Sequence, residues 1–279
     1  MARYLAGAPA GMRAAYRGQI EAWFRWCADN GFDALHAERW QIEAFCGFRH
    51  DRLGNAKTTV NGQLSAIRCF YRYLAEEGFI DSNPAEHARG QRVHKWSDGS
   101  WLTEDEAREF LRLAERRREA FAYGACCLML LNGTRVGETL ALDVTDRGHV
   151  GGIPTVRLRR KLEWMQTIAV SGRTAAALDR AAGRRRSGPL FMWRGRRVTN
   201  HQIGRIVSEL GEQAGADRRI TNHSLRRTFA TLSRKMNVPD RQIMASGGWS
   251  SRSMIDYYDM SRMAVEENAT FVVSDLLDG

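Results

Sequence analysis

The sequence lacks the hydrophobic segments that mark membrane and secreted proteins. No uninterrupted apolar stretch among its 279 residues is long enough to cross a bilayer, and the N-terminus shows no signal-peptide pattern. Internal repeats and low-complexity tracts are also missing. These absences argue against a membrane-spanning or secreted class and predict a cytoplasmic protein with no membrane partner.

Cysteine and metal-ligand patterns are scarce as well. The five cysteines include no Cys-x-x-Cys pair, and Cys126 and Cys127 stand together in an apolar run, as reduced core residues do. No metal-ligand cluster, glycine-rich phosphate loop or Cys/His pair competes for a catalytic role. The sequence therefore predicts chemistry carried by protein side chains, with no cofactor and no metal.

Positive charge is abundant. The formal net charge is +10, on a chain with 43% hydrophobic and 27% charged residues, which is typical of globular proteins. Such a balance favours a polyanionic partner; the alternative is a basic surface that binds nothing. The length allows two domains, each with its own core.

The first 90 residues have the pattern of helices only. Three stretches carry apolar residues at the spacing of buried helix faces. They run through Tyr16, Ile20, Trp23, Phe24 and Cys27; through Trp40, Ile42, Phe45 and Phe48; and through Val60, Leu64, Ile67, Tyr71 and Leu74. We predict an all-helical domain over residues 1–90, followed by a polar and basic linker over residues 91–99.

A mixture of helices and strands follows. A capping box at Thr103-Glu-Asp-Glu106 begins a helix, and residues 121–131 are apolar almost all round, as in a central buried helix. Asn132-Gly133 ends that helix, and Thr134 is a candidate cap for the next turn. The chain then continues with turn residues over 148–152, a half-exposed strand around Val156 and Leu158, a return strand over 168–170, helices over 175–182 and from Thr199 onward, and a solvated loop at Arg184-Arg-Arg186.

One ordered set of polar residues lies near the C-terminus. His223 and Arg226 are three residues apart, which places both on one face of a helix. Apolar residues of the same stretch lie largely on another face: Leu225, Phe229, Leu232 and Met236. A packed helix carries such charge only where an anion or a carboxylate meets it. Trp249 follows two glycines, and Tyr258 lies nine residues after Trp249.

This order of motifs resembles the C-terminal signature of the tyrosine recombinases, which include phage integrases and the Xer- and Cre-type enzymes. The resemblance implies a second arginine roughly 90 residues upstream in a Thr-Gly-x-Arg-x-x-Glu context, where Asn132-Gly-Thr-Arg-Val-Gly-Glu138 supplies Arg135 and Glu138. It also implies a lysine on a strand–turn–strand between the two arginine motifs, and Lys161 aligns there. The resemblance covers nearly the whole chain.

The resemblance implies a mainly α fold with two parts. Residues 1–90 would form an all-helical, SAM-like core-binding domain, and residues 100–265 a mixed α/β catalytic domain with a small antiparallel sheet. Residues 266–279 are acidic and apolar. They would dock on a neighbouring protomer, or alternatively fold on their own domain.

The family's chemistry implies a role for each motif residue. Arg135 and Arg226 would clamp the non-bridging oxygens of a phosphodiester, because guanidinium is planar and stays charged. Tyr258 would attack phosphorus, form a 3′-phosphotyrosyl bond and release a 5′-hydroxyl; its neighbour Tyr257 is the less favoured nucleophile. Either arginine could instead serve as a structural ion-pair partner.

Proton transfer would fall to the remaining residues. His223 suits general acid–base catalysis, and Lys161 would protonate the departing 5′ oxygen. Glu138 would orient the arginine and histidine side chains. The alternatives are a hydrogen-bonded core histidine for His223 and a helix cap for Glu138.

The sequence departs from the family pattern at two places. The lysine turn is usually Gly-Lys-Gly but here reads Arg160-Lys161-Leu162, which leaves Arg159 and Arg160 as competing cations. Trp249 stands where most members have histidine. Cre-type enzymes also have tryptophan at this position. The Trp249 indole can donate one hydrogen bond and pack against the tyrosine helix, but it cannot shuttle protons; packing alone is the alternative.

The resemblance also implies duplex DNA with inverted-repeat core sites as the partner. Candidate contacts are polar residues of the third N-terminal helix, the linker and a later helix start: Lys57, Thr58, Asn61, Arg68, Arg72, Arg92, Lys95, Asn200, His201 and Arg205. A solvated polar face is the alternative for each. Four protomers would join two sites and exchange strands through a Holliday junction, and an accessory DNA-bending factor is a further candidate partner.

We therefore predict an integrase-type site-specific recombinase of the bacterial nucleoid. Because the chain begins at the core-binding domain, we expect it to lack the arm-binding domain of many phage integrases. A Xer-like resolvase fits equally. A type IB topoisomerase shares the nucleophile chemistry, and an inactive DNA-binding regulator on the same fold is a further rival, against which the complete set of motif residues argues.

Overall fold

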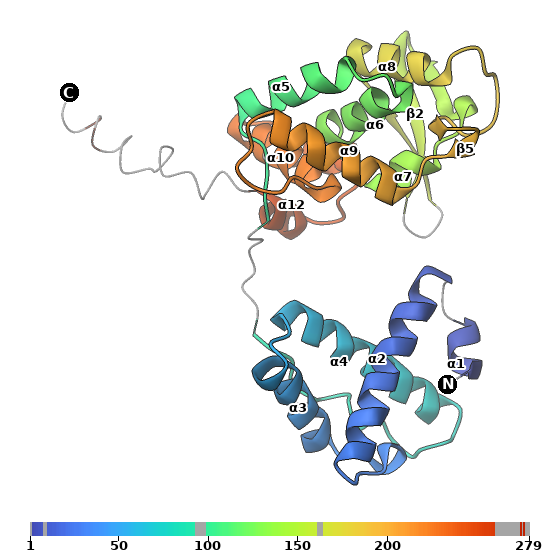
Figure 1. Ribbon diagram of the computed structural model, residues 1–279, viewed down its shortest axis with the longest axis vertical. Helices are drawn as coiled ribbons and strands as arrows, with labels where there is room; N and C mark the ends of the chain where they lie inside the picture. Colours follow the sequence, from blue (N-terminus) through green and yellow to red (C-terminus); the bar gives the residue numbers. More distant parts are fainter. Residues whose placement is uncertain are drawn as a thin grey trace. The chain divides into compact units, whose positions relative to one another are not determined.

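The computed structural model describes residues 2–7, 10–92, 99–160, 164–259 and the single positions 274 and 276. It divides into two compact units, Met1–His94 and Lys95–Gly279 (Figure 1). The division falls in the predicted linker, of which residues 93–98 lie outside the described ranges. Within those ranges, no helix combines the length and the apolar character that crossing a membrane requires.

The N-terminal unit consists of helices in its described part. These are α1 (Ala2–Gly7), α2 (Ala10–Asp29), the 3-10 turn η1 (Ala34–His36), α3 (Arg39–Gly47), the π-helical turn η2 (Phe48–Arg52) and α4 (Lys57–Glu76). The core side chains Trp23 and Tyr71 are fully buried. Trp23 Nε1 donates to Tyr71 Oη at 2.7 Å, and Tyr71 Oη donates to the Ala34 carbonyl at 2.5 Å, so the polar atoms of both rings are satisfied.

The predicted apolar faces of this unit are largely confirmed. Every residue of the α4 stripe is buried, from Val60 to Leu74, as are Ile20, Trp23 and Cys27 of α2. The α3 face is the exception. The prediction places Trp40, Ile42, Phe45 and Phe48 on one buried face, but Trp40 is 52% and Phe48 36% exposed, while Ile42 and Phe45 are buried. Trp40 instead packs edge-on against Phe32 at the margin of the core.

The C-terminal unit is built around one buried helix. Its elements are α5 (Glu104–Glu115), α6 (Ala120–Leu131), α7 (Val136–Ala141), the 3-10 turn η3 (Val144–Asp146), β1 (Arg147–Val150), β2 (Ile153–Arg159), β3 (Met165–Ala169), α8 (Gly172–Ala182), β4 (Met192–Trp193), β5 (Arg196–Arg197), α9 (Asn200–Gln213), α10 (Asn222–Lys235), α11 (Asp240–Gly247) and α12 (Arg252–Tyr258). Residues 121–130 of α6 are all buried, as predicted, and α5, α8 and α10 pack around this helix (Figure 1). The mainly α fold with a small antiparallel sheet is confirmed.

The sheet has the order β1-β2-β3, with both pairs antiparallel. Val156 and Leu158 of β2 are buried while the intervening arginines are exposed, which confirms the predicted half-exposed strand. The prediction of a turn over residues 148–152 is wrong for its first part. Gly148 and His149 belong to β1 and pair with β2, and the turn is confined to Gly151-Gly152, where φ is +54° and +80°.

Two further expectations need correction. The loop at residues 184–186 is not uniformly solvated, because the Arg185 guanidinium donates to the carbonyls of Ala181 and Leu190 and so fastens the loop after α8. Met236 was placed on the packed face of α10 but is 74% exposed. The helix ends at Lys235, and Met236 is its C-cap, where the helical periodicity no longer applies.

Candidate active site

Arg135 enters the site at a sharp reversal between α6 and α7. Gly133 has φ +63°, and a Cβ there would meet the Phe229 ring at 2.4 Å. The expected cap at Thr134 is wrong: Arg135 is the N-cap of α7, and the Thr134 hydroxyl bonds that of Thr139. The Glu138 carboxylate accepts both the Arg135 backbone N–H at 3.1 Å and its Nη1 at 2.7 Å, which orients the guanidinium.

Arg226 is buried in the second turn of α10. A capping box between Thr221 and Ser224 begins this helix, and Arg226 is only 1% exposed. Its Nη1 donates to the carbonyls of Gly133 and Gly247. Its Nε and Nη2 are buried with no hydrogen-bond partner among the described residues. Two donors held in this way make a site that an anion would complete.

Trp249 closes one side of the same site. It follows α11 directly, and Gly248 in the left-handed region (φ +67°) turns the chain there. The indole stacks on Phe229 with ring centroids 6.1 Å apart, and the Arg226 guanidinium carbon lies 3.9 Å from the centroid of the indole ring. Trp249 is 4% exposed, and its Nε1 is a third buried donor without a partner in the described part of the chain.

The short helix α12 brings Tyr258 to these groups. Its ring lies 5.7 Å from the Trp249 ring and 5.5 Å from the Arg226 guanidinium carbon. Tyr257 meets Tyr258 edge-on and is 39% exposed. The arrangement supports Tyr258 over Tyr257 as the residue that belongs to the site.

The site carries more positive than negative charge. Arg135, Arg160 and Arg226 gather around the Glu138 carboxylate and the C-terminal carbonyls of α11. Burial, together with the nearby Arg135 charge, lowers the pKa of Arg226 to about 9. Because like charges gathered in one place repel each other, and Arg160 and Arg226 are buried, the arrangement favours an anionic ligand.

His223 lies one turn before Arg226 at the start of α10, with its side chain reaching solvent. Partial desolvation and the charges of Arg227, Arg226 and Arg135 hold its pKa below the usual histidine value. The imidazole is therefore neutral near pH 7 and can accept a proton. Lys161, with residues 162 and 163, lies outside the described residues, so its role stays a prediction.

The predicted contacts at the start of α9 border the start of α10. Asn200, His201 and Arg205 line a hollow of about 640 Å³ together with Arg219 and Asn222 from the α10 side. Asn222 Nδ2 donates to Asn200 Oδ1 at 2.7 Å, which joins the starts of the two helices. Helix starts present free backbone N–H groups and a positive dipole, so this hollow suits phosphate.

Sequence reasoning missed the short hairpin of β4 and β5. Trp193, Arg194 and Arg196 line a second hollow with Gln202 of α9. The signal was present as Trp193-Arg-Gly-Arg-Arg197, but two-residue strands are too short to show a strand pattern.

The N-terminal candidates divide into two groups. Lys57, Thr58 and Arg72 are exposed along α4, as DNA contacts must be. Asn61 and Arg68 are engaged within the unit. Asn61 exchanges two hydrogen bonds with the Gln91 backbone, and Arg68 donates to the carbonyls of Ala85 and Ala88 at 3.0 and 2.8 Å, so both fasten the segment after α4. Of the linker candidates, Arg92 is exposed, and Lys95 lies outside the described residues.

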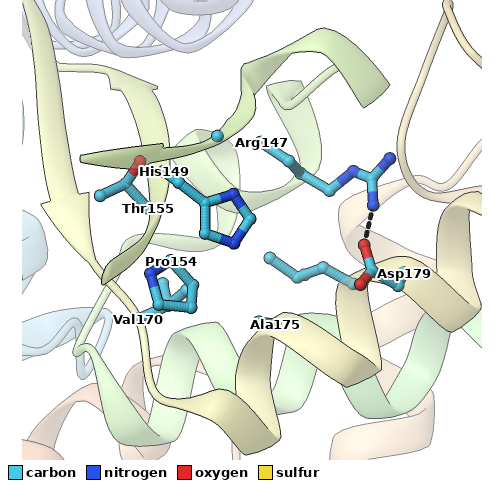
Figure 2. Close-up of a pocket in the computed structure, with 9 residues that line it drawn as sticks. Arg147, His149, Pro154, Thr155, Val170, Ala175 and Asp179 are labelled. Carbon is cyan, nitrogen blue, oxygen red and sulfur yellow. Dashed lines mark hydrogen bonds and ion pairs between the residues drawn. The ribbon is translucent and has the colours of Figure 1, made fainter. Parts of the chain in front are cut away.

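A separate pocket of about 220 Å³ lies between β1, β2 and α8. Figure 2 shows His149 and Pro154 on its sheet side and the ion pair between Arg147 and Asp179 at one end. No predicted site residue lines this pocket, so it is distinct from the site that contains Arg135, Arg226 and Tyr258.

Comparison with known proteins identifies relatives for both units. The model of the phage integrase family matches residues 100–264, and that of the phage integrase N-terminal SAM-like domain matches residues 11–78. Tyrosine recombinase XerC of Thermodesulfovibrio yellowstonii is 28% identical over 260 residues, covering 88% of this chain and 83% of that protein. Tyrosine recombinase XerC of Pelobacter propionicus is 30% identical over 216 residues, covering 72% and 68% respectively.

Solved structures share the fold. A lambda integrase (75–356) dimer bound to a COC′ core site aligns with a TM-score of 0.69 at 18% identity, covering 92% of this chain and 90% of that chain. A lambda integrase tetramer bound to a Holliday junction aligns with a TM-score of 0.70 at 18% identity, covering 95% and 78%. The XerH recombinase bound to palindromic difH aligns with a TM-score of 0.64 at 16% identity, covering 82% and 71%.

Proposed function

Because this chain belongs to the phage integrase family and is a tyrosine recombinase, an enzyme that cleaves and rejoins DNA, we propose that Tyr258 is its nucleophile and that Arg135 and Arg226 hold the scissile phosphate. One observation carries the proposal. Arg226 and Trp249 both keep buried donors without a partner among the described residues, the Arg226 guanidinium carbon lies 3.9 Å from the centroid of the indole ring, and both groups lie beside the Tyr258 ring.

A bound phosphodiester would supply hydrogen-bond acceptors for these donors. The two non-bridging oxygens of the phosphodiester carry the negative charge, and that charge grows as the pentacoordinate transition state forms. Arg226 Nε and Nη2 and Trp249 Nε1 are already fixed by the surrounding protein, so little reorganisation is needed when substrate binds. Arg135, held by Glu138, adds a second guanidinium on the more exposed side of the site.

The strand-cleavage step balances with protein side chains. Tyr258 Oη forms a bond to phosphorus as its proton passes to neutral His223, and the bond from phosphorus to the 5′ oxygen breaks. Lys161 gives a proton to that oxygen, which leaves as a 5′-hydroxyl. The phosphotyrosyl bond conserves the ester, so a 5′-hydroxyl from another strand restores a phosphodiester by the reverse steps without a nucleotide.

Solved structures with the same fold support a proposal for the partner and the assembly. Lambda integrase has been solved as a dimer on a core site and as a tetramer on a Holliday junction. We propose that this chain likewise binds duplex DNA with inverted-repeat core sites and joins two sites as a tetramer. An accessory DNA-bending factor and a place at the bacterial nucleoid remain part of the proposal.

A nicked suicide substrate tests the nucleophile. When the piece of strand that leaves is short, it diffuses away and the phosphotyrosyl enzyme accumulates as a band of lower mobility on a denaturing gel. Tyr258→Phe should abolish this band and leave DNA binding intact, because it removes one oxygen and no charge. Tyr257→Phe is the matched control and should still trap. The reverse pattern would assign the nucleophile to Tyr257.

The same assay separates the remaining functions. Relatives called tyrosine recombinase XerC favour a Xer-like resolvase as the second candidate. A resolvase and an integrase both trap covalently only at a specific site, whereas trapping on DNA of any sequence would indicate a topoisomerase. Absence of trapping by the unaltered protein on its own site would indicate an inactive DNA-binding regulator.

A further inference from the structure

Arg160 is a buried arginine for which the chemistry above has no role. It is the residue that follows β2, directly before Lys161 in the sequence, and its side chain is only 4% exposed. From the sequence alone, Arg160 is a candidate to take the place of Lys161 as the catalytic cation. A donor to the leaving oxygen must reach the substrate, and this side chain is enclosed by protein.

Each of the three guanidinium nitrogens of Arg160 donates to a protein acceptor. Nη1 pairs with the Glu138 carboxylate at 2.5 Å, Nη2 donates to the Ser246 carbonyl at 2.7 Å, and Nε donates to Gln166 Oε1 at 2.8 Å. Arg226, by contrast, keeps two nitrogens without a partner among the described residues. Arg160 is therefore built into the protein, whereas Arg226 has donors left for a ligand.

These contacts join the turn end of the β2–β3 hairpin to the end of α11. Across the hairpin, Arg160 N donates to the Trp164 carbonyl at 2.7 Å, and Gln166 Nε2 of β3 donates to the Ala245 carbonyl at 3.0 Å. The acceptors on the α11 side are the last carbonyls of that helix, which carry the negative end of its dipole and favour a cation. Both strands of the hairpin are thus fastened to the segment that precedes Trp249.

We propose that Arg160 is a positioning residue that fixes the turn end of the β2–β3 hairpin, from which the chain continues into Lys161, against Glu138 and the C-terminal end of α11. The inference rests on the proposed function of Lys161 as the donor to the 5′ oxygen. In this arrangement Glu138 serves both cations: one carboxylate oxygen holds Arg135 and the other holds Arg160. Arg160, which stands where the family's Gly-Lys-Gly turn usually has its first glycine, provides this attachment through its side chain.

The geometry explains why Gly248 lies beside this arginine. A Cβ at Gly248 would meet the Arg160 guanidinium carbon at 2.7 Å. The Gly248 carbonyl also accepts from Arg135 at 3.3 Å. The backbone at this position therefore approaches two guanidinium groups at once, and a side chain would displace the Arg160 group.

A substrate with sulfur in place of the bridging 5′ oxygen gives a specific test. A thiolate leaves without being protonated, so cleavage of this substrate does not need the proton donor. Arg160→Gln should slow single-turnover cleavage of the oxygen substrate by about 10-fold or more, as loss of a well-placed general acid does, and should cleave the sulfur substrate at the wild-type rate. Arg157→Gln, on the exposed face of the same strand, is the matched control and should cleave both substrates as the wild type does.

Gln166→Ala keeps the test valid if Arg160→Gln folds poorly. It removes the Arg160 Nε acceptor and the bond to Ala245 without leaving a buried charge unpaired, and it should give the same pattern with a smaller loss. Equal slowing on both substrates would overturn the proposal, because Arg160 would then act on the phosphate clamp or on folding. An unchanged rate on the oxygen substrate would overturn it as well.

Lys161→Ala separates this inference from the function on which it rests. It should show the same loss and the same rescue by sulfur, and the double variant with Arg160→Gln should lose no more than Lys161→Ala alone. If the wild type cleaves but Lys161→Ala is not rescued, the role of Lys161 is wrong. If Lys161→Ala is rescued and Arg160→Gln is not, only the positioning role of Arg160 is wrong.

Discussion

Arg226 shows how burial can leave the donors of an arginine without acceptors in the described protein. Its guanidinium is almost fully enclosed, and two of its nitrogens have no acceptor in the described protein. Leaving such donors unpaired costs free energy that a bound phosphate oxygen recovers. Arg226→Ala and Arg135→Ala should therefore each lower single-turnover cleavage by ~10²-fold or more, as when a preorganised donor to a transition state is removed.

Arg241→Ala provides the control for this prediction. Arg241 has the same charge and lies on α11, but its side chain is exposed. Its removal should leave the cleavage rate unchanged, and all three variants should still bind the core site in a gel-shift titration. A rate near the wild-type value for Arg135→Ala or Arg226→Ala would remove that arginine from the clamp.

His223 predicts a dependence of cleavage on pH. Partial desolvation and the nearby positive charges lower its pKa from the usual 6.5. Protonation removes the base, so the rate should fall as the pH drops through this lowered pKa. Arg227→Gln removes the neighbouring charge with the largest effect on this pKa, which raises the pKa, and the acid limb should move to higher pH. His223→Asn should lower the rate and abolish that limb, and a limb that Arg227→Gln does not move would contradict the electrostatic cause.

The end of α11 shows how one turn holds several groups in place. Gly248 adopts a left-handed conformation and approaches Arg160 closely. Gly248→Ala should lower the free energy of unfolding by about 1–2 kcal/mol through the strained backbone alone, and cleavage should fall further because the guanidinium must move. Chemical denaturation and single-turnover cleavage measure the two effects. Gly137→Ala, on α7 with open space around it, should be neutral or stabilise by up to ~1 kcal/mol.

The elements of the fold differ in how much the sequence reveals. Long amphipathic helices such as α4 could be predicted from spacing, because burial of one face repeats over several turns. Arg135, His223, Arg226 and Tyr258 could be predicted as a set, because their ordered motifs resemble one family. The role of Arg160 could not, since it depends on carbonyls of α11 that lie about 86 residues away in the chain. Likewise, nothing local distinguishes Arg68, which binds backbone carbonyls, from the exposed Arg72.

At the scale of the whole molecule, the net charge of +10 predicts DNA binding that weakens with salt. Lys57→Ala and Arg72→Ala should each reduce the slope of log binding constant against log salt concentration by about 0.9, the value for one lost phosphate contact. Arg68→Ala should leave the slope unchanged and lower stability by about 1–3 kcal/mol, because two carbonyls lose their donor. Binding titrations at several salt concentrations, with thermal unfolding of each variant, measure both quantities. A reduced slope for Arg68→Ala would restore it as a DNA contact.

The sequence also predicts that the C-terminal tail takes part in protomer assembly. The predicted docking tail, residues 266–279, lies outside the described residues except at positions 274 and 276. It combines four acidic residues with apolar ones, on a chain that is otherwise basic. Burying Phe271, Leu276 and Leu277 in a neighbour would contribute roughly 1.5–3 kcal/mol each before ordering costs. That is enough to bias assembly on DNA but too little to hold a free dimer, so we predict a monomer in dilute solution.

Removing residues 266–279 should therefore separate binding from assembly. The shortened protein should bind a single half-site as tightly as the full chain does, because its predicted DNA contacts are retained. On a full site it should lose cooperativity, since the second protomer no longer gains the contact made by the tail of the first. Gel-shift titrations on half-sites and full sites measure this difference, and light scattering of the free full chain checks the monomer. Unchanged cooperativity would show that the tail folds on its own domain, and that protomers meet through other surfaces.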